Sequence, residues 1–198
     1  MRIFISGPSG VGKSTIISEV LKRNPDIVLS VSYTTRKPRP EEMHGREYYF
    51  ISPQEFEEMV SKGVFLEWAQ VHDHTYGTSL DWVSRYEKEG KHILFDIDVQ
   101  GVRQARERGF TGSYVFIIPP SIDELAKRLK HRGTENEKSF SLRLKNAREE
   151  LRCWKMYDYI VVNGVIGQAV KDVQSIIDAT RCSRTEMAGR IPWLQEIG

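Results

Sequence analysis

Short apolar runs alternate with longer segments of helical periodicity along most of the chain. Five runs are almost continuously apolar, as expected of parallel strands covered on both faces. They lie at residues 2–6, 27–33, 92–98, 114–118 and 159–162. Helical patterns lie at residues 14–24, 53–62, 79–90, 100–108, 121–131, 136–152 and 167–180. This alternation predicts an α/β fold with a five-stranded parallel sheet, flanking helices and right-handed crossovers.

The alternation breaks between residues 34 and 84. That stretch begins in a proline-rich loop and continues with the short strand-like runs REYYF, VFLEWAQV and HTYGTS, which predict a separate small sheet. We therefore predict a core of residues 1–33 and 85–180 and an inserted, mixed α/β substrate subdomain of residues 34–84. The tail, residues 181–198, has no predicted role.

A second irregular stretch, residues 128–148, is dense in cations and lacks a clean apolar stripe at its centre. The pattern predicts a mobile, solvated lid within the core, carried between two helices.

The composition of the chain argues against several classes of function. The 198 residues carry 29 Lys and Arg against 27 Asp and Glu, a balance that does not favour general nucleic-acid binding. No apolar run approaches the roughly 20 residues of a membrane span, and the start MRIFIS lacks the layout of a signal peptide. We expect a cytoplasmic protein that binds no membrane and whose two cysteines, Cys153 and Cys182, are reduced.

Residues 7–15, GPSGVGKST, fit the phosphate-loop pattern G-x-x-x-x-G-K-[ST] between a predicted strand and a predicted helix. Its glycines allow backbone N–H groups to converge on phosphate oxygens at a helix N-terminus. Lys13 can reach the β and γ phosphates, and the Ser14 hydroxyl can ligate Mg²⁺. The predicted nucleoside triphosphate contacts are Gly7, Pro8, Ser9, Gly10, Val11, Gly12, Lys13, Ser14 and Thr15. Switch GTPases, motor ATPases and small-molecule kinases all share this pattern.

Seven short motifs, taken together, indicate a protein family more specifically than the phosphate loop alone. GPSGVGKST, SVSYTTRKPRP, GREYYF, FLEWAQV, YGTS, DIDVQG and RGTENE follow one another in the order found in guanylate kinases. The chain resembles that family from residue 2 to about residue 180. The resemblance implies transfer of the γ-phosphate of ATP to GMP with Mg²⁺, on a parallel-sheet core with a GMP-binding subdomain and a lid.

The resemblance assigns the phosphate of GMP to Arg36 and Arg39, together with the hydroxyls of Tyr48 and Tyr76. The residue types suit that role, because guanidinium groups bind phosphate in a bidentate manner. Taken alone, two arginines on a proline-rich loop would more often be a solvated surface.

The resemblance also assigns recognition of the guanine base to Glu67, Ser32 and Thr78. A carboxylate can accept both the N1–H and 2-NH₂ donors of guanine, whereas adenine would leave it unpaired. The hydroxyls of Ser32 and Thr78 would serve O6 or N7. The sequence FLEWA leaves open whether Glu67 faces the site or is a strand residue on the solvent side.

Asp96 and Asp98, in DIDVQG, end a predicted strand where ligands bind in open α/β sheets. They could hold Mg²⁺ through water, bind GMP or orient Lys13. Asp98 could also simply cap the following helix.

The resemblance assigns catalytic roles to Lys13, Arg36 and the lid residues Arg132 and Arg143, with Arg148 a weaker match. Asn163 is expected near the adenine of ATP. Two departures from the family pattern are Glu41, where a glycine is usual, and Gly164, where an acidic residue is usual.

A guanylate-kinase-like scaffold that binds peptides and no longer catalyses is the main rival, but such modules have degraded phosphate loops. A kinase for AMP or dTMP is opposed by Ser32, Glu67 and Thr78. The segment 72–74 (His-Asp-His) lacks a third ligand at a recognisable spacing, so no metal site is predicted there. Whether the protein is a monomer or a homo-oligomer is not predicted.

Overall fold

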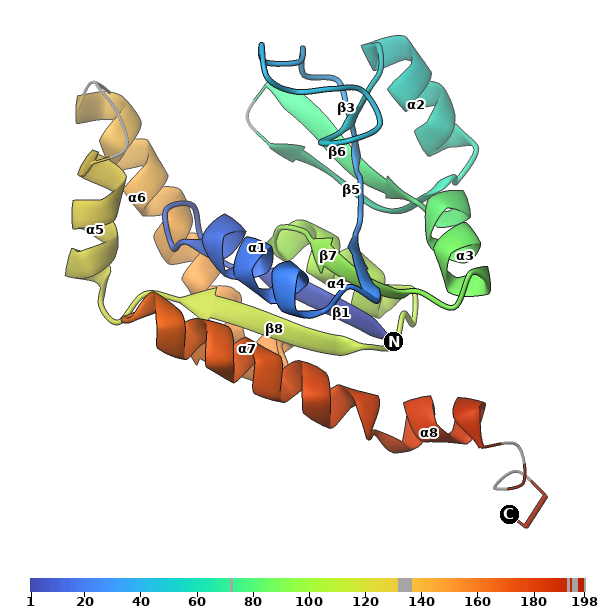
Figure 1. Cartoon of the computed structure of the whole chain (residues 1–198). Helices are drawn as coiled ribbons and strands as arrows, with labels where there is room; N and C mark the ends of the chain where they lie inside the picture. The colour runs from blue at the N-terminus through green and yellow to red at the C-terminus, as the bar shows by residue number, and fades with distance from the viewer. Residues whose placement is uncertain (72, 132–136, 192, 194–195, 198) are drawn as a thin grey trace. The chain divides into compact units, whose positions relative to one another are not determined.

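The computed structural model describes residues 1–71, 73–131, 137–191, 193 and 196–197 (Figure 1). It is an α/β structure with two sheets. The larger has five strands in the order β2-β7-β1-β8-β9, and the smaller has four in the order β4-β3-β6-β5. Every pairing recorded within the larger sheet is parallel. The predicted fold class is confirmed. The chain divides into two compact units, residues 1–25 with 112–198 and residues 26–111.

The first unit contains three neighbouring strands of the larger sheet. β1 (Arg2–Ser6) pairs with β8 (Ser113–Ile118), and β8 pairs with β9 (Tyr159–Val162). The rings of Phe4 and Tyr114 stack with their centroids 4.4 Å apart, and both side chains are buried. The helical elements are α1 (Lys13–Arg23), α5 (Ile122–His131), α6 (Glu137–Arg152), the 3₁₀ helix η1 (Cys153–Met156), α7 (Ile166–Arg181) and α8 (Arg184–Arg190).

Helices α5 and α6 pack side by side (Figure 1). Leu125, Leu129 and Ala147 are buried between them, and Phe140 and Leu144 pack against this cluster. The stretch predicted as a lid therefore has a small apolar contact of its own, although its sequence shows no clean apolar stripe.

The second unit holds the smaller sheet and the other two strands of the larger one. β2 (Ile27–Leu29) pairs in parallel with β7 (His92–Asp96). The smaller sheet consists of β3 (Tyr33–Thr34), β4 (Tyr49–Phe50), β5 (Phe65–Val71) and β6 (His74–Ser79). Its helices are α2 (Pro53–Ser61), α3 (Leu80–Lys88) and α4 (Val99–Glu107). The short strands predicted from REYYF, VFLEWAQV and HTYGTS are confirmed.

One predicted strand, residues 27–33, is wrong as a single element. β2 ends at Leu29, and the chain then leaves the larger sheet to form β3, which pairs with β4 and β6. The apolar pattern continues from β2 into β3, so it gives no sign of the change of sheet.

The C-terminal segment adds α8, which the sequence analysis did not predict. Ser183 caps it by accepting a hydrogen bond from the Glu186 N–H, and the Glu186 carboxylate lies 3.1 Å from the amino group of Met1. Across the residues that the structure describes, no helix is long and apolar enough to cross a membrane.

Candidate active site

The phosphate loop occupies the turn between β1 and α1 in the first unit. Gly10 and Gly12 have φ angles of 85° and 95°, a region that favours glycine. The N–H of Val11 donates to the carbonyl of Pro8 at 3.1 Å, which closes the turn. Lys13 begins α1, so the loop ends at a helix N-terminus, where backbone N–H groups and the helix dipole favour phosphate.

Two side chains from outside the loop hold the Val11 carbonyl. The amide Nδ2 of Asn163, which is buried, donates to it at 2.7 Å. Arg128, on α5, donates from Nη1 to the Asn163 carbonyl at 2.9 Å and to the Val11 carbonyl at 3.5 Å. Asn163 is thus placed at the phosphate loop. Arg128 was missed by sequence reasoning, because its only visible signal was an i, i+4 pairing with Glu124.

One of the two predicted lid arginines also reaches the loop. Nη2 of Arg143, on α6, donates to the Ser9 hydroxyl at 3.1 Å. Arg132 lies outside the described residues. The weaker candidate, Arg148, is exposed on α6.

In the second unit, Glu67 lies on β5 opposite Thr78 of β6, and only 4% of its surface is exposed. The alternative of a solvent-side strand residue is therefore wrong. The Thr78 hydroxyl and backbone N–H donate to the Glu67 carboxylate, and the hydroxyls of Ser32 and Thr78 are 3.5 Å apart. Burial raises the pKa of Glu67 to about 7, and the charge of Asp98 adds to the rise. The three residues predicted to read guanine form one polar cluster, in which Glu67 and Thr78 are buried and Ser32 is half-buried.

Helix α4 borders this cluster. Oδ1 of Asp98 accepts a hydrogen bond from the N–H of Gly101 at 2.8 Å, so Asp98 is the N-cap of α4. The capping role that the sequence left open for Asp98 is therefore confirmed. Further along the helix, Gln104 makes two hydrogen bonds with the backbone of Trp68, at 3.1 Å from the Trp68 N–H and 2.6 Å to its carbonyl. Sequence reasoning missed Gln104, whose partner is a backbone group 36 residues away.

Arg36 lies where the residues predicted for the GMP phosphate meet. Its guanidinium is 5.4 Å from the centre of the Tyr48 ring and hydrogen-bonds Tyr76. The two tyrosine rings are in edge contact, with centroids 5.8 Å apart. Burial raises the pKa of Tyr48, and the nearby charge of Asp96 adds to this rise, which places Asp96 beside the same cluster.

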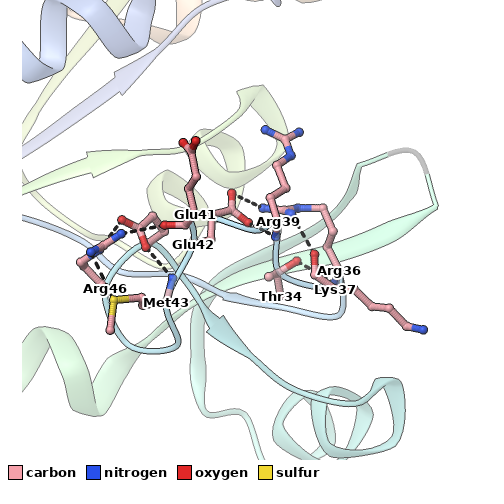
Figure 2. A network of polar contacts seen from close by, with 9 residues as sticks. Thr34, Arg36, Lys37, Arg39, Glu41, Glu42, Met43 and Arg46 are labelled. Atoms are coloured by element: carbon pink, nitrogen blue, oxygen red, sulfur yellow. Dashed lines mark hydrogen bonds and ion pairs between the residues drawn. The ribbon is translucent and has the colours of Figure 1, made fainter.

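Glu42 ties the two predicted arginines together (Figure 2). Its Oε1 accepts from Nη2 of Arg36 and its Oε2 from the backbone N–H of Arg39, both at 2.8 Å. The hydrogen bond from Arg36 lowers the pKa of Glu42, which keeps the carboxylate charged. The side chain of Arg39 is exposed. Glu42 was also missed, and Glu41, the departure from the family pattern, is exposed and contributes only its carbonyl, to Arg46 at 2.8 Å.

The structure thus places the predicted ATP residues in the first unit and the predicted GMP residues in the second. A parallel α/β fold with a complete phosphate loop and a second set of side chains predicted to bind an anion indicates a kinase of the phosphate-loop class.

Comparisons with known proteins make this more specific. The family described as guanylate kinase matches residues 1–180. The guanylate kinase of Geobacter metallireducens is 46% identical to this chain, and the match covers 90% of this chain and 88% of the relative. The guanylate kinase of Thermotoga maritima is 44% identical, and the match covers 94% of this chain and 90% of the relative. The crystal structure of guanylate kinase from Anaplasma phagocytophilum is 30% identical, with a TM-score of 0.74 over 93% of this chain and 87% of that one. The chain belongs to the guanylate kinase family and is a nucleotide kinase.

Proposed function

We propose that the chain transfers the γ-phosphate of ATP to GMP, giving ADP and GDP, with Mg²⁺ as cofactor. The observation that carries this proposal is the buried Glu67 carboxylate with its Thr78 and Ser32 neighbours, in a chain that also has a complete phosphate loop. A carboxylate removed from water and already hydrogen-bonded on one side suits the paired donors of guanine. An adenine at that position would leave the charge without a partner.

On the donor side, the backbone of residues 7–15 and the Lys13 ammonium would bind the phosphates of ATP, with Asn163 near the adenine. The Ser14 hydroxyl is exposed in the first turn of α1 and is a hard oxygen donor, which suits Mg²⁺. When bound, the ion neutralises charge on the β and γ phosphate oxygens. The water-mediated contribution of Asp98 stays a prediction.

On the acceptor side, Arg36, Arg39, Tyr48 and Tyr76 would bind the GMP phosphate. Arg36 donates to Glu42, the Lys37 carbonyl and Tyr76, which fixes its plane, and its five N–H groups leave further donors for a phosphate. Asp96 lies beside the same tyrosines and would contact GMP or the ion.

The reaction needs positioning and charge neutralisation rather than a protein nucleophile. A phosphate oxygen of GMP attacks the γ-phosphorus in line, and the bond from the γ-phosphorus to the β–γ bridging oxygen breaks, so ADP leaves with the electron pair. Lys13, Arg36 and Arg143 would stabilise the charge on the transferring group, and Arg132 keeps its predicted share of that role. Closure of residues 128–148 as a lid would exclude water.

The division into a core, a GMP-binding subdomain of residues 34–84 and a lid stays a prediction, as does a cytoplasmic location. The scaffold alternative is not favoured, because the phosphate loop is intact and the named relatives are guanylate kinases.

The test is an assay that couples ADP release to a spectroscopic signal, with GMP, dGMP, AMP, CMP and dTMP as acceptors. We expect turnover with GMP far above that with AMP, CMP and dTMP. A Glu67→Gln variant should lose much of the preference for GMP over AMP. No turnover with any acceptor would favour the scaffold, and an unchanged GMP/AMP ratio in Glu67→Gln would refute the assigned base reader.

A further inference from the structure

Gly101 has no evident conformational reason to be glycine. It is the third residue of α4, it is buried, and its φ angle lies outside the left-handed region that favours glycine. Glycine in such a helical position is less favourable than alanine. Another requirement must therefore account for a residue without a side chain at this point.

That requirement is the space taken by the Glu67 carboxylate. A Cβ added to Gly101 would lie 2.7 Å from Oε2 of Glu67 and 3.2 Å from its Cδ, with the Cβ of Ile97 also at 3.2 Å. The first distance is shorter than van der Waals contact allows. Either the helix or the carboxylate would have to move to admit a methyl group.

The helix is held in place along the face that carries Gly101. Gln104, one turn further on, hydrogen-bonds both the N–H and the carbonyl of Trp68, next to Glu67 in sequence. Arg108, one turn beyond that, donates to the carbonyl of Phe65. Three hydrogen bonds, two from Gln104 and one from Arg108 at the C-cap, thus fix α4 against β5. The Glu67 side chain, which has rotatable bonds, would be the part that yields.

We propose that Gly101 is a specificity-determining residue, whose missing side chain leaves the space in which the Glu67 carboxylate is held for guanine. This inference rests on the proposed function of Glu67 as base reader. Gly101 does not touch the substrate; it sets the position of the group that does. A methyl group there would leave the fold intact and displace the carboxylate.

The test compares three variants with the unmodified chain: Gly101→Ala, Glu67→Gln and Gly167→Ala. Gly167 is the matched control, because it lies in the first turn of α7 and nothing stands within 4 Å of an added Cβ. We expect Gly101→Ala to lower the GMP/AMP ratio of kcat/KM by about tenfold or more. We expect Gly167→Ala to leave that ratio unchanged. The Tm of Gly101→Ala should remain close to that of the unmodified chain.

A second pair of variants keeps the contact testable if Gly101→Ala is unstable. In a Glu67→Ala background the overlap with the carboxylate is gone and only the 3.2 Å contact with Ile97 remains, so adding Gly101→Ala should lower Tm less than it does in the unmodified chain. If Gly101→Ala lowers Tm equally with and without the Glu67 side chain, the inference is wrong.

The outcomes separate this inference from the proposed function. If Glu67→Gln lowers the GMP/AMP ratio and a folded Gly101→Ala does not, Gly101 has no part in specificity while Glu67 keeps its role. If neither Glu67→Gln nor Gly101→Ala changes the GMP/AMP ratio, Glu67 does not read the base, and the inference about Gly101 is wrong as well.

Discussion

At the scale of single residues, Glu67 carries most of the proposed specificity, and its position was the hardest to predict from the sequence. A regular strand alternates its two faces, but the pairing of β5 with β6 shifts between Phe65 and Glu67. As a result Phe65, Leu66 and Glu67 are all buried in succession. No alternation rule could have revealed that. The consequence is a carboxyl group whose pKa, at about 7, leaves it only partly ionised at neutral pH.

This pKa predicts a pH dependence for GMP binding. Only the ionised Glu67 can accept both guanine donors, so binding should draw the carboxyl into its charged form and release a proton. The affinity for GMP should therefore be highest above pH 7 and fall below it, by up to about tenfold per pH unit. Calorimetry of GMP binding between pH 5.5 and 8.5, in buffers of different ionisation enthalpy, measures both the affinity and the proton release.

Glu67→Gln is the control for this prediction, because the 5′-phosphate of GMP also titrates, near pH 6. In this variant the titration of the GMP phosphate still affects binding, whereas the titration of the Glu67 carboxyl group is absent. A pH profile with the same shape in both proteins would show that Glu67 does not titrate on binding.

At the scale of elements, the loop between β3 and β4 depends on Glu42. Its carboxylate joins the side chain of Arg36 to the backbone of Arg39 (Figure 2). We expect Glu42→Ala to weaken GMP binding by about tenfold, because Arg36 loses the partner that fixes its plane. Guanosine, which lacks the phosphate, should bind Glu42→Ala and the unmodified chain equally. Competition binding with both ligands measures the difference.

Two further variants separate geometry from charge in this loop. Glu42→Gln keeps an acceptor for Arg36 and removes a negative charge near the phosphate, so it should bind GMP more tightly than Glu42→Ala. Glu41→Ala removes the same charge from an exposed neighbour and should change nothing. Equal losses of GMP affinity in Glu41→Ala and Glu42→Ala would mean that the loop responds to charge alone.

Helix α5 has a comparable link to the phosphate loop through Arg128. Because Arg128 hydrogen-bonds the carbonyls of Asn163 and Val11, its removal should loosen the loop and raise the KM for ATP several-fold. GMP binding should be unaffected. Steady-state kinetics of Arg128→Ala measure this, with the exposed neighbour Lys127→Ala as control. A change confined to the KM for GMP would contradict the role assigned to Arg128.

At the scale of the whole molecule, the sequence predicted the order of elements and the phosphate loop because both are local patterns. Alternating apolar runs and the spacing of Gly7, Gly12 and Lys13 depend on neighbours in sequence. Long-range partnerships were not predictable in this way. Arg128 with Asn163, and Gln104 with Trp68, join residues about 35 apart through backbone groups, which carry no residue type to recognise. The change of sheet after Leu29 was missed for the same reason.

The placement of the predicted ATP and GMP residues in different units leads to a prediction about Lys13, which begins α1 in the first unit. Lys13→Met removes the ammonium group that is predicted to face the triphosphate and keeps the length of the side chain. We expect phosphoryl transfer to fall by at least about a thousandfold, because this charge stabilises the transferring group. The affinity for GMP, measured by calorimetry without ATP, should stay within about twofold, since the GMP residues are untouched. Loss of GMP affinity together with activity would mean that the two substrates are not bound by separate sets of residues.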